Sequence, residues 1–233
     1  MKLPVLKTQA IMPAAGLGTR LQAAVPKPFV LLDGEPIFIH TLKVLAECPG
    51  IESIVVVAPP DHLSRFEETI QRCHFQKTVK VVGGGATRTE SVFNGLAAVD
   101  ADTEMVVIHD GARPLIKLSV IEEAVKLCRE SGAVVVAVPV KPTIKKVHPA
   151  SLLVEETLNR EELWEAQTPQ VFKKEILMKA YEEHGEDPAT DDAGLVERLG
   201  REVKILRGDY DNIKITTQED LLIAEVLLKA RRG

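Results

Sequence analysis

Short apolar runs alternate with stretches of helical spacing over the first part of the chain. Runs rich in valine and isoleucine, typical of buried strands, occupy residues 10–12, 54–58, 79–82, 105–108 and 133–138. Between them, apolar side chains recur every three or four positions, which predicts helices over residues 37–48, 63–73, 89–98 and 119–131. Because the strands are apolar at nearly every position, both faces of their sheet must be covered. The pattern therefore predicts an α/β fold with a doubly wound, mostly parallel sheet.

The alternation changes after Pro139. Residues 140–165 alternate like a two-stranded ribbon, and no helix follows to cover them. Since an isolated hairpin is at best marginally stable in water, we expect a protruding β-ribbon arm that packs on a second subunit. Beyond the ribbon, the pattern predicts two strands and three helices: strands at 203–206 and 213–215, and helices at 174–183, from 190–192 onward, and at 218–230. No linker or repeat divides the chain, so we expect a single domain over residues 1–233 with the arm as an appendage.

Composition removes several classes of function. The chain has a net charge of −5, which disfavours nucleic acid as a partner because binding to a phosphate backbone needs a basic face. No run approaches the roughly 18 apolar residues of a membrane span, and the N-terminus lacks a secretory pattern, so we expect no membrane contact and a cytoplasmic protein. Cys48, Cys73 and Cys128 show no Cys-x-x-Cys spacing, so neither disulfides nor structural zinc are expected.

The most informative polar motif directly follows the first strand, at residues 13–20 (PAAGLGTR). Its two glycines let backbone N–H groups approach a polyphosphate or a base closely. Arg20 and, a little further on, Lys27 supply the positive charge that phosphoryl transfer requires. The loop lacks the Lys-Ser or Lys-Thr of a P-loop, and Leu21 stands where a Rossmann fingerprint has glycine or alanine. The motif indicates a nucleotide triphosphate site, and the alternative is a plain tight turn.

A second glycine-rich motif, residues 83–91 (GGGATRTES), joins a strand to a helix. Three successive glycines are costly in backbone entropy, and they allow a flat base to lie against the main chain. Arg88 and Ser91 share one face at the helix start, where the serine hydroxyl could bond a base edge. The alternative for Ser91 is a hydrogen bond back to the main chain of its own helix.

The third motif is residues 109–114 (HDGARP), at the end of another apolar strand. Asp110, facing a polyphosphate, suits Mg²⁺, which prefers one or two carboxylates together with phosphate oxygens and water. The alternative is an aspartate that caps a turn. Arg113 is a candidate cation for a second phosphate, or else a surface arginine. His109 points away from the aspartate by alternation and is interpreted as a core histidine.

Together with residues 168–170, 212–214 and 219–221, these motifs resemble the 2-C-methyl-D-erythritol 4-phosphate cytidylyltransferase family. The first glycine loop is shared with many sugar-nucleotide pyrophosphorylases, whereas residues 109–114 are specific. The resemblance runs in the family's order from about residue 8 to residue 230. It implies a Rossmann-like nucleotidyltransferase fold, with CTP and 2-C-methyl-D-erythritol 4-phosphate as substrates and 4-diphosphocytidyl-2-C-methyl-D-erythritol and pyrophosphate as products. It places this reaction in non-mevalonate isoprenoid biosynthesis, and it implies a homodimer joined through the β-arm.

The resemblance also implies roles for individual residues. It implies that Arg20 and Lys27 stabilise the transition state, and that Arg160 and Lys214 orient the methylerythritol phosphate. Asp110 would lie near Mg²⁺, or another divalent cation, and near the substrate hydroxyls. The implied nucleotide-binding residues are Pro13, Ala14, Ala15, Gly16, Gly18, Gly85, Arg88 and Ser91. The implied substrate-binding residues are Asp110, Gly111, Arg113, Thr143, Thr168 and Thr190, of which Thr143, like Arg160, would serve the neighbouring subunit.

Two positions depart from the family, and two other functions remain open. Pro28 stands where glutamine is usual, and Gly111 stands where alanine or serine is common. Neither change touches a charge. One alternative function is a ribitol 5-phosphate cytidylyltransferase, with the same nucleotide half and a different alcohol. The other is a catalytically idle nucleotide-binding regulator on the same fold, against which the presence of both Arg20 and Lys27 argues.

Overall fold

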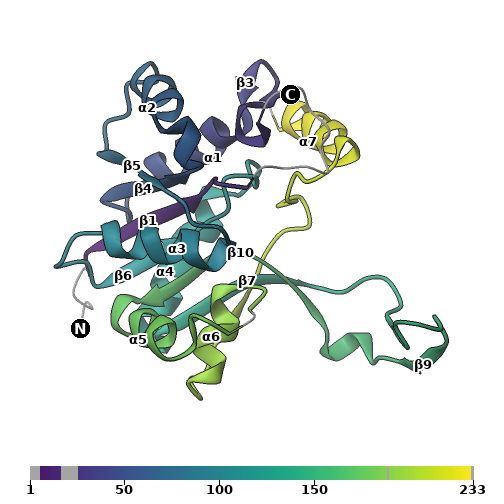
Figure 1. The fold of residues 1–233 in the computed structure, drawn as a ribbon. Coiled ribbons are helices and arrows are strands. Elements are labelled where there is room, and N and C mark those ends of the chain that lie inside the picture. The colour runs from purple at the N-terminus through teal and green to yellow at the C-terminus, as the bar shows by residue number, and fades with distance from the viewer. Residues whose placement is uncertain (1–5, 17–25, 188, 232–233) are drawn as a thin grey trace.

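The computed structural model describes residues 6–16, 26–187 and 189–231 (Figure 1). Within these ranges a seven-stranded sheet runs in the order β11-β7-β10-β6-β1-β4-β5. Every neighbouring pair is parallel except those of β10, which lies antiparallel to both β6 and β7. The strands are β1 (Thr8–Pro13), β4 (Ser53–Ala58), β5 (Val79–Gly83), β6 (Met105–Ile108), β7 (Ala133–Pro139), β10 (Trp164–Lys173) and β11 (Lys204–Arg207).

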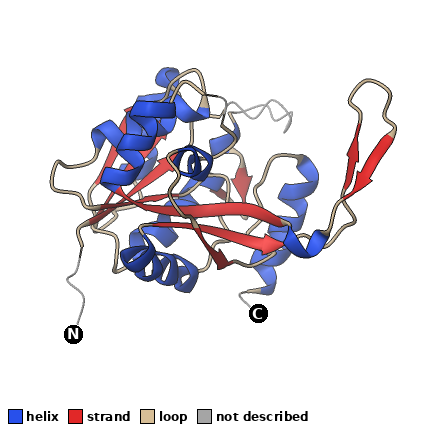
Figure 2. Ribbon diagram, turned by 90° about the horizontal axis from the view of Figure 1, so that it is seen from below, coloured by secondary structure: helices blue, strands red, loops and turns tan. Residues whose placement is uncertain are grey.

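Helices cover both faces of this sheet (Figure 2). Successive residues of a strand point to opposite faces, so Ala10 and Met12 of β1 enter one core and Ile11 enters the other. The first core is closed by α1 (Ile37–Glu47), α2 (Leu63–Gln71) and α4 (Leu118–Ser131). The second is closed by α3 (Arg88–Ala98), α5 (Lys174–His184) and α6 (Asp192–Arg198). The predicted doubly wound, mostly parallel fold is therefore confirmed.

Local capping explains why the predicted helix limits agree closely with the observed ones. Thr87 caps α3 by accepting a hydrogen bond from the Glu90 backbone N–H. Gly132 ends α4 in the left-handed conformation, with φ of 82°. Thr217 and Asp220 form a reciprocal capping box that starts α7 (Gln218–Ala230), the closing helix, at the predicted residue. No helix in the described ranges has the length and apolarity to cross a membrane.

The predicted strand at residues 213–215 is wrong. The segment pairs with no strand of the described structure, and Ile215 instead donates a single backbone hydrogen bond of 2.9 Å to the Ala112 carbonyl, in the loop after β6. Ile215 is buried with Leu32 and Ala224, in a small core formed by α7 and the short hairpin of β2 (Leu31–Leu32) and β3 (Glu35–Pro36). An apolar residue anchored to a loop gives the same sequence pattern as a short strand. The anchoring brings the preceding residue, Lys214, to the carboxyl end of β6.

The arm, residues 140–163, is inserted between β7 and β10 and extends away from the body (Figure 1). It contains the antiparallel pair β8 (Lys145–Val147) and β9 (Val154–Thr157), which confirms the predicted ribbon. The short helix η4 (Arg160–Glu162) precedes β10. Large apolar side chains near the tip lie in solvent, with Leu152 74% and Leu153 69% exposed. Exposed apolar groups this close together are typical of a contact surface.

Candidate active site

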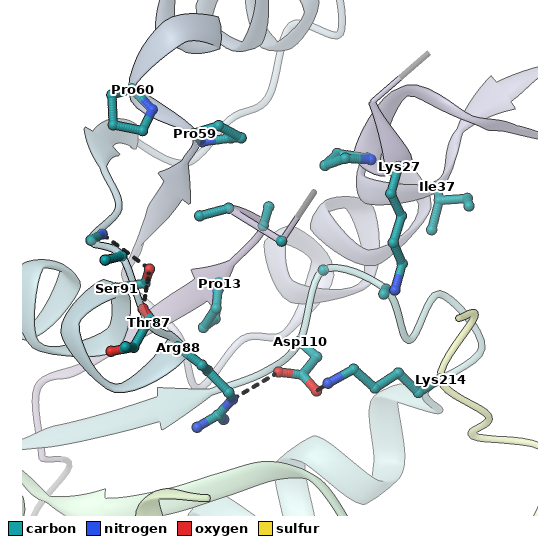
Figure 3. Close-up of a pocket in the computed structure, with 18 of the residues that line it drawn as sticks. Pro13, Lys27, Ile37, Pro59, Pro60, Thr87, Arg88, Ser91, Asp110 and Lys214 are labelled. Carbon is teal, nitrogen blue, oxygen red and sulfur yellow. Dashed lines mark hydrogen bonds and ion pairs between the residues drawn. The ribbon is translucent and has the colours of Figure 1, made fainter. Parts of the chain in front are cut away.

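A cavity of about 550 Å³ opens at the carboxyl ends of β1, β4, β5 and β6 (Figure 3). Ligands of open α/β sheets bind at this edge, and the volume suits a small molecule. The lining includes most residues that the sequence indicated for the nucleotide and several for catalysis and substrate. They are Pro13, Ala14, Ala15, Gly16, Lys27, Gly85, Arg88, Ser91, Asp110, Gly111 and Lys214.

The remaining predicted site residues are placed elsewhere. Gly18 and Arg20 lie outside the described residues. Thr168 and Arg113 are buried beneath the cavity, 4% and 7% exposed. Thr143 and Arg160 are exposed on the arm, and Thr190 is exposed shortly before α6. The chain alone thus does not bring the arm residues to the cavity.

Asp110 is the centre of charge in this site. The Lys214 ammonium lies 2.7 Å from Oδ2 of Asp110, and Nε of Arg88 lies 3.6 Å from Oδ1 (Figure 3). Nε of Arg113 lies 3.9 Å from Oδ2. Burial alone would raise the pKa of this carboxyl, but the surrounding cations hold it well below its usual range. Asp110 is therefore a carboxylate at neutral pH.

A hydrogen bond to the Thr168 side chain holds the Asp110 backbone in place, and Thr168 is itself held by His109. The Asp110 backbone N–H donates to Oγ1 of Thr168 at 3.1 Å, and that hydroxyl lies 3.0 Å from Nδ1 of His109. Nε2 of His109 lies 3.1 Å from the Arg113 carbonyl, which can only accept, so Nε2 carries the proton and Nδ1 accepts from Thr168. Burial lowers the pKa of His109 to about 4. The interpretation of His109 as a satisfied core histidine is confirmed.

The surroundings of Arg113 differ from those expected by either hypothesis from the sequence, which were a cation for a second phosphate and a surface arginine. It is not a surface arginine, because it is 7% exposed and donates from Nη1 to the Asn212 carbonyl at 2.7 Å. It does not line the cavity, so a direct contact with a phosphate stays a prediction. What it does in the described structure is join the loop after β6 to the segment that carries Lys214.

The loop between β5 and α3 makes a close backbone contact with the loop after β1. A Cβ on Gly84 would lie 2.6 Å from Cβ of Ala15 and 2.9 Å from Oγ of Ser91. Ser91 accepts a hydrogen bond of 3.1 Å from the Gly85 N–H and donates one of 2.8 Å to the Thr87 carbonyl. Ser91 therefore bonds to its own helix, as its alternative interpretation held, and it fixes the loop. Its contact with a base edge stays a prediction.

The sequence interpretation missed one wall of the cavity. Pro59, Pro60 and Asp61 directly follow β4 and line the cavity. Figure 3 shows Pro59 and Pro60 on the side opposite Asp110. Ile37 and Thr87 also contribute. The sequence did contain a signal for this wall, since the three residues follow a predicted parallel strand and the ends of such strands share one edge. They were missed because their side chains do not suggest a particular chemistry. Lys27, from the short helix η2 (Lys27–Phe29), extends into the cavity from another side (Figure 3).

A doubly wound sheet with two glycine loops around a carboxylate that pairs with Lys214 and Arg88 defines a Rossmann-like nucleotidyltransferase. The family model described as "IspD: 2-C-methyl-D-erythritol 4-phosphate cytidylyltransferase" matches residues 8–230. The chain belongs to this family, and the resemblance inferred from the motifs is confirmed.

Individual relatives agree over nearly the whole chain. A protein of this name from Desulforamulus reducens is 45% identical over 225 residues, which cover 95% of this chain and 96% of the relative. One from Geobacillus thermodenitrificans is 46% identical over 225 residues, covering 96% and 97%. The crystal structure of 4-diphosphocytidyl-2C-methyl-D-erythritol synthase from Anaerococcus prevotii is 32% identical and superposes with a TM-score of 0.86 over 97% of each chain.

Proposed function

We propose that this protein transfers the cytidylyl group of CTP to 2-C-methyl-D-erythritol 4-phosphate, with release of pyrophosphate, in non-mevalonate isoprenoid biosynthesis. The family supports the reaction, since its members carry the name of this activity. The observation that carries the proposal is the ring of Arg88, Lys214 and Asp110 in a cavity walled by two glycine loops. The part of the cavity lined by the two glycine loops suits a base and ribose. The part lined by Lys214, Arg88 and Asp110 suits phosphates.

The chemistry needs no nucleophile from the protein. A phosphate oxygen of the alcohol substrate attacks the α-phosphorus of CTP in line, and the bond to pyrophosphate breaks on the opposite side. Catalysis of such a step is mainly orientation and stabilisation of charge. Lys27 and Arg20 are proposed to stabilise the transition state. Lys214, with Arg160 of the neighbouring subunit, is proposed to hold the methylerythritol phosphate.

Mg²⁺ is the proposed cofactor, and Asp110 fits it. Among the described residues, no group of three or more His, Cys, Asp or Glu side chains could hold a metal ion. Mg²⁺ needs only one or two carboxylates when phosphates and water complete its shell. A carboxylate accepts about four contacts, and Lys214, Arg88 and Arg113 leave room for one more. The ion would supply positive charge to the triphosphate.

The arm supports a homodimer as the active form. Its tip exposes Leu152 and Leu153, and Val154 is 58% exposed. A two-fold contact would bury each arm on the other subunit without creating a new exposed surface. At the arm's base Arg160 donates to the Lys141 carbonyl at 3.1 Å, which holds its side chain at the root of the ribbon. In the dimer, Arg160 and Thr143 would then be delivered to the partner's cavity.

A cytoplasmic location is proposed on the state of the thiols. Cys48, Cys73 and Cys128 are all free. Free thiols persist in a reducing compartment and are oxidised or paired elsewhere.

The decisive experiment is pyrophosphate release from purified protein, with each nucleotide paired with each polyol phosphate. We expect turnover with CTP and methylerythritol phosphate, and at least about tenfold lower kcat/KM with UTP or ATP. A preference for ribitol 5-phosphate would favour the first alternative. Binding of CTP with no pyrophosphate from either alcohol would favour the idle regulator.

A further inference from the structure

A second buried carboxylate, Asp192, lies behind the cavity. It is the first residue of α6 and is only 1% exposed, and it does not line the cavity. Its Oδ2 accepts a charged hydrogen bond of 2.8 Å from Nη2 of Arg88. The same guanidinium turns its Nε toward Asp110 in the cavity, at 3.6 Å. One arginine thus connects a carboxylate that a ligand can reach with one that it cannot.

Hydrogen bonds hold both the side chain and the backbone of Asp192 in place. Its Oδ1 accepts a hydrogen bond of 2.6 Å from the Tyr181 hydroxyl, on α5. Its backbone N–H and that of Ala193 donate to Oε1 of Gln170, on β10, at 3.2 and 3.1 Å. Gln170 in turn donates to Asp191, the residue that caps α6. Each carboxylate oxygen of Asp192 therefore has a strong hydrogen-bond donor. The carboxylate cannot rotate without losing at least one of these two hydrogen bonds.

Stability alone gives little reason for this arrangement. Desolvation of a buried ion pair cancels much of its attraction, so an apolar pair of similar volume often stabilises a protein as well. Burial lowers the pKa of Arg88, but Asp192 and Asp110 outweigh it and the net shift is upward, so the guanidinium stays charged. The ion pair between Arg88 and Asp192 does fix the orientation of the Arg88 guanidinium. With its Nη2 held by Asp192, Arg88 lies closest to Oδ1 of Asp110, and Oδ2 is left to Lys214 and Arg113.

We propose that Asp192, supported by Tyr181, is a positioning residue that acts on the reaction through Arg88. In its absence the guanidinium would turn fully onto Asp110 and displace Lys214 from Oδ2. The inference rests on the proposed function, because its main readout is cytidylyl transfer. Asp192 itself contacts no substrate.

A double-mutant cycle on kcat/KM tests this directly. Asp192→Asn is expected to lower kcat/KM per folded molecule at least tenfold, and Arg88→Met at least as much. If Asp192 acts only through Arg88, the double variant is no worse than Arg88→Met alone. Its thermal stability should also exceed that of either single variant, because no unpaired buried charge is left. Tyr181→Phe, which removes one hydroxyl, should retain the fold and lower kcat/KM two- to fivefold.

Asp187→Asn is the matched control. Asp187 follows α5 and pairs with Arg198 at 3.5 Å, but half of its side chain is in solvent. This variant should keep wild-type kcat/KM. Unchanged kcat/KM per folded molecule in Asp192→Asn would overturn the proposal, as would a double variant a further tenfold below Arg88→Met.

An NMR measurement separates this inference from the proposed function. In protein labelled with ¹⁵N-arginine, the Nε–H signal of Arg88, assigned with Arg88→Lys, should be sharp in the wild type and in Asp187→Asn. It should broaden or shift in Asp192→Asn. Wild type that fails to release pyrophosphate would reject the proposed function while leaving this result standing, and an unaltered Arg88 signal would reject the positioning role whatever the activity.

Discussion

Lys214 and Asp110 form an ion pair of 2.7 Å across the top of the sheet, although they lie on segments far apart in the sequence. The contact depends on Ile215, whose backbone hydrogen bond to Ala112 joins the two segments. Lys214 is thereby held at the cavity by a protein anion, with 39% of its side chain in solvent. A substrate phosphate can approach this ammonium without the lysine having to be ordered first, which reduces the entropic cost of binding.

Replacing Asp110 with asparagine keeps the side-chain shape and removes the charge. We expect a higher Mg²⁺ concentration for half-maximal activity, because the ion loses a hard anionic ligand. Activity titrated against Mg²⁺ measures the effect. Asp211→Asn is the control, since Asp211 pairs with Arg231 at 3.7 Å on the segment that leads to Lys214. Full activity with an unaltered Mg²⁺ curve would assign Asp110 to capping the turn.

Removing either cation proposed to stabilise the transition state should affect turnover far more than folding. For Lys27→Ala, and for Arg20→Ala, we expect kcat to fall about 10²-fold or more, the scale of a lost preorganised donor, with little change in Tm. Lys43→Ala is a suitable control, since Lys43 pairs with Glu35 at 2.6 Å and does not line the cavity. Near wild-type turnover in both variants would reduce these residues to surface charges and support the regulator.

Gly84 is expected to be essential at the nucleotide end, whereas its neighbour Gly83 is not. A Cβ at position 84 would lie 2.6 Å from Cβ of Ala15, which forces the two loops apart, whereas one at position 83 would meet nothing nearer than 3.9 Å. Gly84→Ala should therefore weaken CTP binding about tenfold or more, since loss of shape and of hydrogen-bond alignment combine. Gly83→Ala should bind CTP normally. Calorimetric titration with CTP compares the two variants, and equal affinities would show that this contact does not shape the pocket.

Subunit mixing tests whether the arm completes the partner's site. Arg160→Ala and Lys27→Ala should each be nearly inactive alone. In a mixed dimer one site collects both substitutions and the other collects none, so random exchange of equal amounts should restore about a quarter of wild-type activity. Sedimentation must confirm a dimer and native mass spectrometry the exchange. Mixed dimers that remain inactive, or an active monomer, would return Arg160 to a surface role.

Cys128 should resist alkylation in the folded protein. Burial raises the pKa of this thiol to about 12, and its Sγ lies 3.3 Å from the Val171 carbonyl in the core beneath β10. Almost no thiolate, the reactive form, is therefore present at pH 8. Cys73, which is only partly buried, should react first with iodoacetamide. Peptide mass spectrometry before and after denaturation checks the order, and early labelling of Cys128 would mean that this core opens readily.

The sequence predicted six of the seven strands of the described sheet, because each of the six is a short apolar run. It also predicted that the three motifs meet, since the carboxyl ends of parallel strands share one edge. It did not predict β10, which is antiparallel to both of its neighbours, because Trp164–Lys173 mixes polar and apolar residues and is not a short apolar run. It did not predict the pairing of Arg88 with Asp192 either, since that contact depends on how α6 packs beside α3. Residues 213–215 were misassigned for the same reason: their pattern does not say what they pair with.

The antiparallel strand β10 has a consequence for how assembly and catalysis are connected. Trp164, at its start, pairs with Pro139 at the root of the arm, and Thr168 on the same strand accepts the hydrogen bond from the Asp110 backbone. The proposed subunit contact and Asp110 are therefore connected through a single strand, β10. We expect a substitution that alters how the arm docks to affect the surroundings of Asp110 as well, so that assembly and activity change together.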